Sequence, residues 1–266
     1  SDEILKRVVE SYRRIRNTLR FLLANISDFD PEKSLLPPER WLEIDRYALV
    51  LTQELQAQVL ADYERYEFHP VAAKLQTFCS EDLGAFYLDV LKDRLYTTGT
   101  DSLPRRAAQS ALFHITQCLL RLMAPILSFT AEEAWATALG KSSSIFEETW
   151  YSLPEVEGSA MLSARWKSIR EARAAVQKHL ETLREAGKIG SSLQAEIDIG
   201  VAGEKYAALA SLGEDLRFVM ITSRAGLKEV ASGDVERIDA TPSAHSKCQD
   251  RKSTRLNSSH VALSRM

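Results

Sequence analysis

The stretch DEILKRVVESYRRIRNTLRFLLANI, residues 2–26, decides the fold of the first part of this chain. Apolar side chains recur in it at steps of three and four, which is the period of one face of an α-helix. They are Ile4, Val8, Tyr12, Ile15, Leu19, Leu22, Leu23 and Ile26. A helix with such a stripe must bury it against other elements. The stretch therefore predicts a long helix that packs into a larger helical assembly.

More segments with helical periodicity follow this helix. We expect them at residues 38–67, at 69–98 with an interruption near Ser80, and at 102–139. Pro37 and Pro38 stand at a helix start, where proline is least costly. Pro125 should break the last segment because proline removes a backbone donor, and TAEE (130–133) then resembles a capping box that restarts a helix. Long helices with short connections indicate an antiparallel helix bundle over residues 1–150.

The character of the sequence changes beyond the bundle. Residues 140–159 are rich in Gly, Ser and Pro and predict a surface linker. One more helix is expected at 164–190, and the apolar period then falls to two, which is typical of strands. Strands are expected at 193–201, 217–225 and 227–232, with a helix at 204–216. The predicted fold is mainly α, with a C-terminal helix and small α/β module over residues 151–245 and a disordered tail over 246–266.

Composition excludes several classes of protein. The formal net charge is -3, with 45% hydrophobic and 27% charged residues, which is ordinary for a globular domain. No run of 18 apolar residues exists, so we expect no membrane association. The three cysteines, Cys79, Cys118 and Cys248, lie far apart, which favours a reducing compartment, the cytoplasm. The chain opens on charged residues without an initiator Met, so we expect a piece of a longer protein.

Signals of catalysis are absent from the sequence. It has no glycine-rich phosphate loop, no H-E-x-x-H and no G-x-S-x-G. His114 lies within an apolar helical stripe, where a histidine is more often a packing residue. Glu132 and Glu133 are adjacent, so they point to different faces of a helix and favour a helix start over an acid–base pair. We predict no catalytic residue in this chain.

Basic side chains gather at two places in the bundle. Arg13, Arg16 and Arg20 are spaced by three and four and share one helical face, and Asn17 beside them both donates and accepts hydrogen bonds. The second group lies in FYLDVLKDRLYTTGTDSLPRRAAQ, residues 86–109. Its members are Lys92, Arg94, Tyr96, Arg105 and Arg106. These groups are consistent either with solvated helix faces or with an RNA surface, since guanidinium groups pair with phosphates and stack on bases.

Four stretches carry a resemblance to a known family. They are YRRIRNTLRFLLANISDFDP (12–31), DLGAFYLDVLKDRLYTTGTDSLPRRAAQSAL (82–112), LMAPILSFTAEEAW (122–135) and KIGSSLQAEIDI (188–199). Together they resemble the C-terminal region of bacterial isoleucyl-tRNA synthetases, which are class I aminoacyl-tRNA synthetases. The resemblance runs from residue 1 to about residue 248. AFYLDVLKDRLY and KIGSSL are its more specific parts.

The resemblance implies recognition of a tRNA anticodon arm. The family's ATP motifs, HIGH and KMSKS, do not occur here, so the chain would cover the helical anticodon-binding domain and the module after it. The implied partner is the tRNA for isoleucine, bound by a monomeric ligase that uses ATP, while this piece should be inactive alone. Both basic groups become candidate tRNA contacts. The alternative is a helical protein-interaction module without RNA binding.

The resemblance also implies a truncated metal site. Bacterial members continue with a zinc ribbon, and Lys247 and Cys248 match its beginning. A structural zinc site needs four ligands, and Cys248, even with His245 nearby, cannot supply them. We therefore expect no cofactor in this chain, with Cys248 as a remnant, and zinc only in the full-length parent. Residues 249–266 resemble translated adaptor or vector sequence rather than the family.

Overall fold

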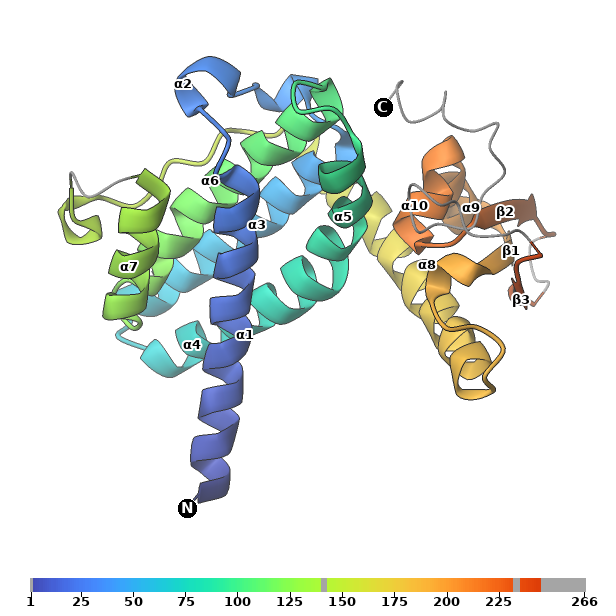
Figure 1. The fold of residues 1–266 in the computed structure, drawn as a ribbon, viewed down its shortest axis with the longest axis horizontal. Helices are drawn as coiled ribbons and strands as arrows, with labels where there is room; N and C mark the ends of the chain where they lie inside the picture. The colour runs from blue at the N-terminus through green and yellow to red at the C-terminus, as the bar shows by residue number, and fades with distance from the viewer. Residues whose placement is uncertain (1, 140–142, 232–234, 245–266) are drawn as a thin grey trace. The chain divides into compact units, whose positions relative to one another are not determined.

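The computed structural model describes residues 2–139, 143–231 and 235–244. The chain divides into two compact units, with the boundary between Ser159 and Ala160. In its described residues the first unit contains helices and no strand, and the second combines helices with a small sheet (Figure 1). The fold is therefore mainly α with a small α/β module, as the sequence predicts.

Unit 1 is built from antiparallel helices of unequal length. Their bounds are α1 Asp2–Ile26, α2 Pro31–Ser34, η1 Pro38–Arg40, α3 Glu43–Glu64, α4 Phe68–Thr77, η2 Phe78–Tyr87, α5 Leu88–Thr97, α6 Leu103–Met123, α7 Ser128–Leu139 and η3 Ile145–Glu147. Helix α6 contacts α1, α3, α5 and α7 and lies at the centre of the unit (Figure 1). Leu112, Ile115 and Leu119 on α6 are fully buried. The core forms around this helix, which is buried along most of its length.

The expected helix 38–67 is shorter in the structure. Pro38 begins a single 3-10 turn, and Trp41 then takes an extended conformation while its indole Nε1 donates to the Leu36 carbonyl at 2.8 Å. Helix α3 starts only at Glu43. It ends at Glu64, before Tyr66, whose positive φ of 59° breaks the helical path. The predicted helix is therefore shortened at both ends, at its start by the extended Trp41 and at its end by the turn at Tyr66.

The expected helix 69–98 is continuous, but its middle is a π-helix. Helix η2 (Phe78–Tyr87) lies between α4 and α5, and the Leu88 amide donates to the carbonyl of Leu83, five residues back. The wider turn leaves the Cys79 carbonyl to accept a hydrogen bond from Thr18 Oγ1 of α1 at 3.1 Å. Single π-segments commonly mark such insertions of a side chain into the helical ladder.

Two further expectations in unit 1 are changed by packing. Helix α7 begins at Ser128, two residues before the predicted capping box, and Thr130 instead bonds the Tyr12 hydroxyl at 3.0 Å. The expected surface linker is bonded to α3 in its described residues, 143–158. Gln53 and Gln56 of α3 donate side-chain hydrogen bonds to the carbonyls of Pro154 and Tyr151, both at 2.7 Å. These bonds fix the segment along unit 1.

Unit 2 holds the small sheet. Its elements are α8 Ser159–Glu185, η4 Ser192–Gln194, β1 Ala195–Val201, α9 Gly203–Ala210, η5 Gly213–Asp215, α10 Leu216–Met220, β2 Arg224–Glu229 and β3 Arg237–Pro242. The strand order is β2-β1-β3, with β1 parallel to β2 and antiparallel to β3. Ile197 and Ile199 of β1 are buried, and the alternate positions Glu196 and Asp198 bind Arg224 of β2.

The predicted strand 217–225 is wrong for most of its length. Residues 216–220 form α10, which ends at Ile221 with a left-handed φ of 56°, and β2 starts at Arg224. The apolar run Phe218–Ile221 suits a buried strand or a buried helical turn equally well, so periodicity could not separate them. Strand β3 was not expected, because its residues are mostly exposed and polar.

Candidate nucleic-acid interface

The first candidate surface is the exposed side of α1. Arg13, Arg16, Asn17 and Arg20 are all exposed, whereas Ile15 and Leu19 between them are buried. A rise of 1.5 Å per residue spreads the three arginines over roughly 10 Å of helix. We name these four exposed residues the α1 basic face. The apolar stripe turns inward, so the polar positions of the same helix have to face solvent.

Arg16 is held in place by α7. Its Nη1 donates to Glu133 Oε2 at 3.1 Å and its Nη2 to Glu133 Oε1 at 3.4 Å. Nη1 also lies 3.4 Å from the Tyr12 hydroxyl. The Glu133 hydrogen bond raises the pKa of Arg16, which stays charged. Both side chains are about half exposed, so this pair orients the guanidinium and contributes little to stability.

The other members of the α1 basic face are less constrained. Arg13 Nη1 binds Glu10 at 3.0 Å, with both side chains at least half exposed. Within the described ranges, neither Asn17 nor Arg20 makes a side-chain hydrogen bond or ion pair. The face therefore presents one oriented and two loosely held guanidinium groups, plus an amide able to donate and accept.

The second candidate group is divided by burial. Lys92 and Tyr96 of α5 are exposed, and Lys92 Nζ binds Asp89 at 3.0 Å. Arg94, by contrast, is only 9% exposed and pairs with the fully buried Asp45 of α3. The Tyr87 hydroxyl donates to the same Asp45 oxygen at 2.8 Å. Arg94 thus ties α5 to α3 inside unit 1, and the proposed interface excludes it.

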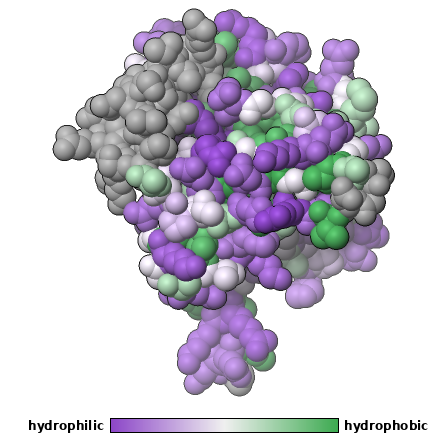
Figure 2. Space-filling view, turned by 90° about the vertical axis from the view of Figure 1, so that its right-hand side faces the viewer, coloured by the Kyte–Doolittle hydropathy of each residue, from purple (hydrophilic) through white to green (hydrophobic). Residues whose placement is uncertain are grey.

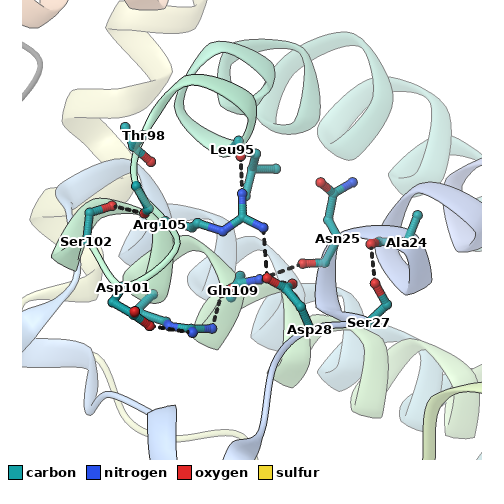
Figure 3. A network of polar contacts seen from close by, with 12 residues as sticks. Ala24, Asn25, Ser27, Asp28, Leu95, Thr98, Asp101, Ser102, Arg105 and Gln109 are labelled. Atoms are coloured by element: carbon teal, nitrogen blue, oxygen red, sulfur yellow. Dashed lines mark hydrogen bonds and ion pairs between the residues drawn. The ribbon is translucent and has the colours of Figure 1, made fainter.

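Arg105 and Arg106 occupy the first turn of α6, as the sequence predicts, but both guanidinium groups are engaged, that of Arg105 as Figure 3 shows. Arg105 donates to the Leu95 carbonyl and to Asp28 Oδ2, the latter at 3.0 Å. Arg106 bridges Gln109 and Asp101, both at 2.9 Å. Their side chains are only 18% and 17% exposed.

Gln109 completes this corner. Its amide donates to Asp28 Oδ1 at 2.7 Å and to the Asn25 carbonyl at 2.9 Å, at the end of α1 (Figure 3). Partial burial would raise the pKa of Asp28, but the Arg105 hydrogen bond and charge outweigh it and lower that pKa. Ion pairs and hydrogen bonds at this corner join the end of α1, the end of α5 and the start of α6.

The structure therefore does not gather the predicted residues into a single cluster. Arg16 lies against α7, while Asp28, which binds Arg105, lies just beyond the end of α1 at Ile26. Ten residues of helix from Arg16 to Ile26 correspond to roughly 15 Å. An RNA arm would have to lie along α1 to meet both groups.

Two residues near Arg16 were not among the predicted contacts. Glu133 is its ion-pair partner, and Phe129, four residues earlier on α7, is 93% exposed. Residues at i and i+4 share a helix face, so the Phe129 ring lies one turn from Glu133. An exposed ring beside a guanidinium group can stack on a base. The sequence predicted only that Glu132 and Glu133 point to different faces of their helix. Nothing in it showed that the Phe129 ring lies outside the core.

A second exposed aromatic group lies where α3 meets α4. Tyr63 stacks on Trp150 with ring centroids 5.8 Å apart, and Phe68 packs against Tyr63 at 5.9 Å. Trp150 also lines a cavity of about 310 Å³ with Phe146, Pro125 and the paired Arg121 and Glu148. This cavity is mostly apolar, and its one charged pair is already satisfied.

The described residues contain no group of side chains suited to bind a metal ion. Within residues 2–139, 143–231 and 235–244, no three His, Cys, Asp or Glu side chains are grouped so that they could hold an ion. Burial raises the pKa of both Cys79 and Cys118 to about 12, which disfavours the thiolate that zinc binds. Cys248, the expected remnant of a truncated zinc site, and the nearby His245 lie outside the described residues. No helix in the described part of the chain could cross a membrane.

Comparison with known proteins gives the family. Residues 45–199 match the family model "Anticodon-binding domain of tRNA ligase". The chain is 61% identical to the isoleucine–tRNA ligase of Azoarcus sp. (strain BH72) over 250 residues, which is 94% of this chain and 27% of that protein. It is also 61% identical to that of Ralstonia pickettii (strain 12J) and 59% identical to isoleucine–tRNA ligase 1 of Burkholderia mallei (strain ATCC 23344), in each case over 94% of this chain and 26% of the relative.

The chain thus spans about a quarter of the length of these relatives. The family match begins in α3 and ends in β1, so it includes the corner of Lys92 and Arg105 but not the α1 basic face. With more than half of its residues matched, this chain belongs to the anticodon-binding domain family of tRNA ligases.

Proposed function

We propose that this chain binds the anticodon arm of the tRNA for isoleucine. The observation that carries the proposal is the match of residues 45–199 to the anticodon-binding domain of tRNA ligases. The identity of 61% to two isoleucine–tRNA ligases supports isoleucine as the amino acid. None of the comparisons supports the alternative of a helical protein-interaction module without RNA binding.

The proposed contacts are the α1 basic face and four residues of the α5–α6 corner, of which Lys92 and Tyr96 are exposed and the two arginines are largely covered. On α1 they are Arg13, Arg16, Asn17 and Arg20, and at the corner Lys92, Tyr96, Arg105 and Arg106. RNA is recognised mostly where bases are unstacked, as in a loop, by aromatic stacking and polar contacts to base edges. Arg105 and Arg106 sit at the start of a long helix, whose backbone amides and dipole favour phosphate.

Arg16 is the best single candidate for a base contact. Glu133 orients its guanidinium, Asn17 supplies a neighbouring donor and acceptor, and Phe129 offers an exposed ring one turn from Glu133. A phosphate contact would be indifferent to the anticodon, whereas a base contact discriminates between anticodons by about 1–3 kcal/mol. We favour the base contact because Arg16 is held at a fixed position by two hydrogen bonds.

We further propose that the chain acts as part of a longer ligase. That ligase would attach isoleucine to its tRNA using ATP, with zinc bound in the full-length parent beyond this chain, as a monomer in the cytoplasm. The chain alone holds neither ATP motif of the resemblance and should catalyse no isoleucine-dependent ATP–pyrophosphate exchange. Exchange by the pure chain above a no-protein control would contradict this.

The test of RNA binding compares two arginines on one helix. Arg16→Ala is measured beside Arg14→Ala, because Arg14 lies about 160° away around α1 and is also exposed. Fluorescence anisotropy gives the Kd of each variant for the isoleucine tRNA and for the same tRNA with a swapped anticodon. The expected result is a loss of about 10–100-fold for Arg16→Ala with the matched anticodon only.

Three other outcomes are informative. Equal loss for both tRNAs would make Arg16 a phosphate contact. Unchanged affinity with an intact circular dichroism spectrum would remove Arg16 from the interface. No binding of either tRNA by the unmodified chain, in a buffer of low salt, would reject the proposed function for this chain.

A further inference from the structure

Exposed charge alone marks no site on this molecule. Figure 2 shows hydrophilic residues over most of the face that it draws. The ion pair of Arg16 and Glu133 is distinguished by its arrangement, because it joins α1 to α7 across 117 residues of sequence. An exposed pair such as Arg13–Glu10, by contrast, joins residues three apart on one helix. A charged pair that bridges two helices and still faces solvent is a candidate for recognition.

A second contact beside the pair fixes its position. Thr130 lies three residues before Glu133 on α7, and Tyr12 lies four residues before Arg16 on α1. Residues at these spacings share a helix face. The Tyr12 hydroxyl lies 3.0 Å from Thr130 Oγ1 and 3.4 Å from Arg16 Nη1. The guanidinium and the carboxylate are therefore held side by side, although their side chains are 44% and 64% exposed.

The Glu133 carboxylate occupies the part of Arg16 that would otherwise hold a phosphate. It accepts one hydrogen bond from each terminal nitrogen of the guanidinium. This forked geometry is the one in which arginine binds phosphate. A phosphate offers only acceptors and negative charge, so it would have to displace Glu133 and would be repelled by it. The pair is neutral as a whole and disfavours a phosphate at Arg16.

The edge of a base matches the pair where a phosphate does not. An arginine has more N–H donors than the two that Glu133 accepts, so donors remain available. The largely exposed carboxylate also keeps acceptor positions for a further donor. Bases carry donors and acceptors side by side on their edges, and unpaired bases of a loop expose those edges. Such an edge can bond to Arg16 and Glu133 at the same time.

We infer that Glu133 is a specificity-determining residue of the proposed anticodon site. Its carboxylate accepts a hydrogen bond from an unpaired anticodon base, on an edge where a donor lies beside an acceptor, and it excludes backbone phosphates from Arg16. This role rests on the proposed function and goes beyond holding Arg16 in place. A charge placed against the wrong partner is a general means of specificity.

Two substitutions separate the charge of Glu133 from its positioning of Arg16. Glu133→Gln removes the charge but keeps an oxygen that can accept from Arg16. Glu133→Asp keeps the charge, but its shorter side chain weakens the positioning bonds. Glu10→Gln is the control, because it removes a half-exposed carboxylate that pairs with Arg13 and Arg14 on α1. Fluorescence anisotropy at several salt concentrations gives the Kd of each variant for the isoleucine tRNA and for the same tRNA with a swapped anticodon.

Glu133→Gln should bind the swapped tRNA about 3–10-fold more tightly at low salt, because a phosphate can then reach Arg16. The slope of log K against log salt for that tRNA should steepen by about one. The ratio of the two Kd values should fall by about tenfold, since the base loses its charged acceptor. Glu133→Asp should keep the affinity of the parent for the swapped tRNA. Glu10→Gln should change the binding of both tRNAs alike and leave their ratio unchanged.

The absence of tighter binding of the swapped tRNA by Glu133→Gln would overturn the role of Glu133. If that variant resembles the parent while Glu133→Asp loses matched binding, Glu133 only positions Arg16. An equal fall in the ratio for Glu10→Gln would show a general effect of charge and would also overturn it. These results leave the proposed function standing, provided that the parent binds the matched tRNA. Binding of neither tRNA by the parent would reject both. Circular dichroism checks that each variant is folded.

Discussion

His114 illustrates how burial alone sets the chemistry of a residue. Its ring packs near Trp41 and Tyr151, and its Nδ1 lies 2.8 Å from the Tyr151 hydroxyl. Burial lowers the pKa of His114 to about 4, below the ordinary value of roughly 6.5. The histidine is therefore a neutral packing residue at neutral pH, as its place in an apolar stripe predicts.

The shifted pKa of His114 makes stability depend on pH. The unfolded chain binds the proton more tightly than the folded chain does. The contribution of neutral His114 to the free energy of unfolding is therefore fully present above pH ~6.5 and is lost as the pH falls toward 4. The expected loss is about 3 kcal/mol. His114→Gln should weaken the pH dependence of the unfolding free energy, measured with urea between pH ~6.5 and ~4.5. His69→Gln, at an exposed position, is the control and should leave that dependence unchanged. An unchanged pH slope in His114→Gln would contradict the assignment.

Arg94 and Lys92 allow a direct test of structural against surface roles. Arg94→Met leaves the buried Asp45 without its ion-pair partner, which should lower the free energy of unfolding by about 3–5 kcal/mol. Lys92→Met, two residues away and exposed, should change it by less than about 0.5 kcal/mol. Chemical denaturation of both variants checks this. A similar small effect in both would mean that the Asp45–Arg94 pair is not structural.

At the scale of elements, the sequence predicted an interruption near Ser80 but not its form, the π-helix η2. An apolar helical pattern indicates which side chains face the core. A π-helix changes the spacing of the backbone hydrogen bonds but leaves most of these side chains in the core. In this chain Leu83, Phe86 and Tyr87 of η2 are all buried. The change shows in the contacts of the Cys79 carbonyl oxygen. It accepts a hydrogen bond from Thr18 Oγ1, and Gly84 lies so close to it that an added Cβ would be crowded.

Gly84 gives the prediction at this scale. An alanine in place of glycine ordinarily stabilises a helix by up to about 1 kcal/mol. At position 84 the added Cβ would lie 3.0 Å from the Cys79 carbonyl, which Thr18 holds. Gly84→Ala should therefore destabilise unit 1 by about 1–2 kcal/mol. Gly99→Ala, where a Cβ meets nothing within 4 Å, should lie within about 0.5 kcal/mol of the parent. Stabilisation by Gly84→Ala, measured by thermal unfolding, would show that η2 relaxes to an ordinary helix.

For the whole molecule, the distribution of charge matters more than its sum. The formal net charge of -3 gives no general attraction to nucleic acid, so the proposed tRNA binding would have to come from local groups such as the α1 basic face. Removing one cation that pairs with a phosphate reduces the slope of log K against log salt by about one. The Arg13→Ala, Arg20→Ala double variant should therefore lower the slope for tRNA by about two if both arginines bind phosphates. Equal slopes for the variant and the parent would show that neither arginine binds a phosphate.

The sequence by itself determined the helical bundle, the change to an α/β module and the family, because apolar periodicity and local motifs are properties of neighbouring residues. It also placed Arg105 and Arg106 at a helix start. Only the tertiary structure decided which charged groups are available. Arg94 and Lys92 are two residues apart in a polar stretch of sequence. Arg94 is nevertheless buried in an ion pair with Asp45, 49 residues away, whereas Lys92 stays in solvent. Arg16 is oriented by Glu133, 117 residues away. Such pairings depend on how helices distant in sequence pack together, which no local pattern records.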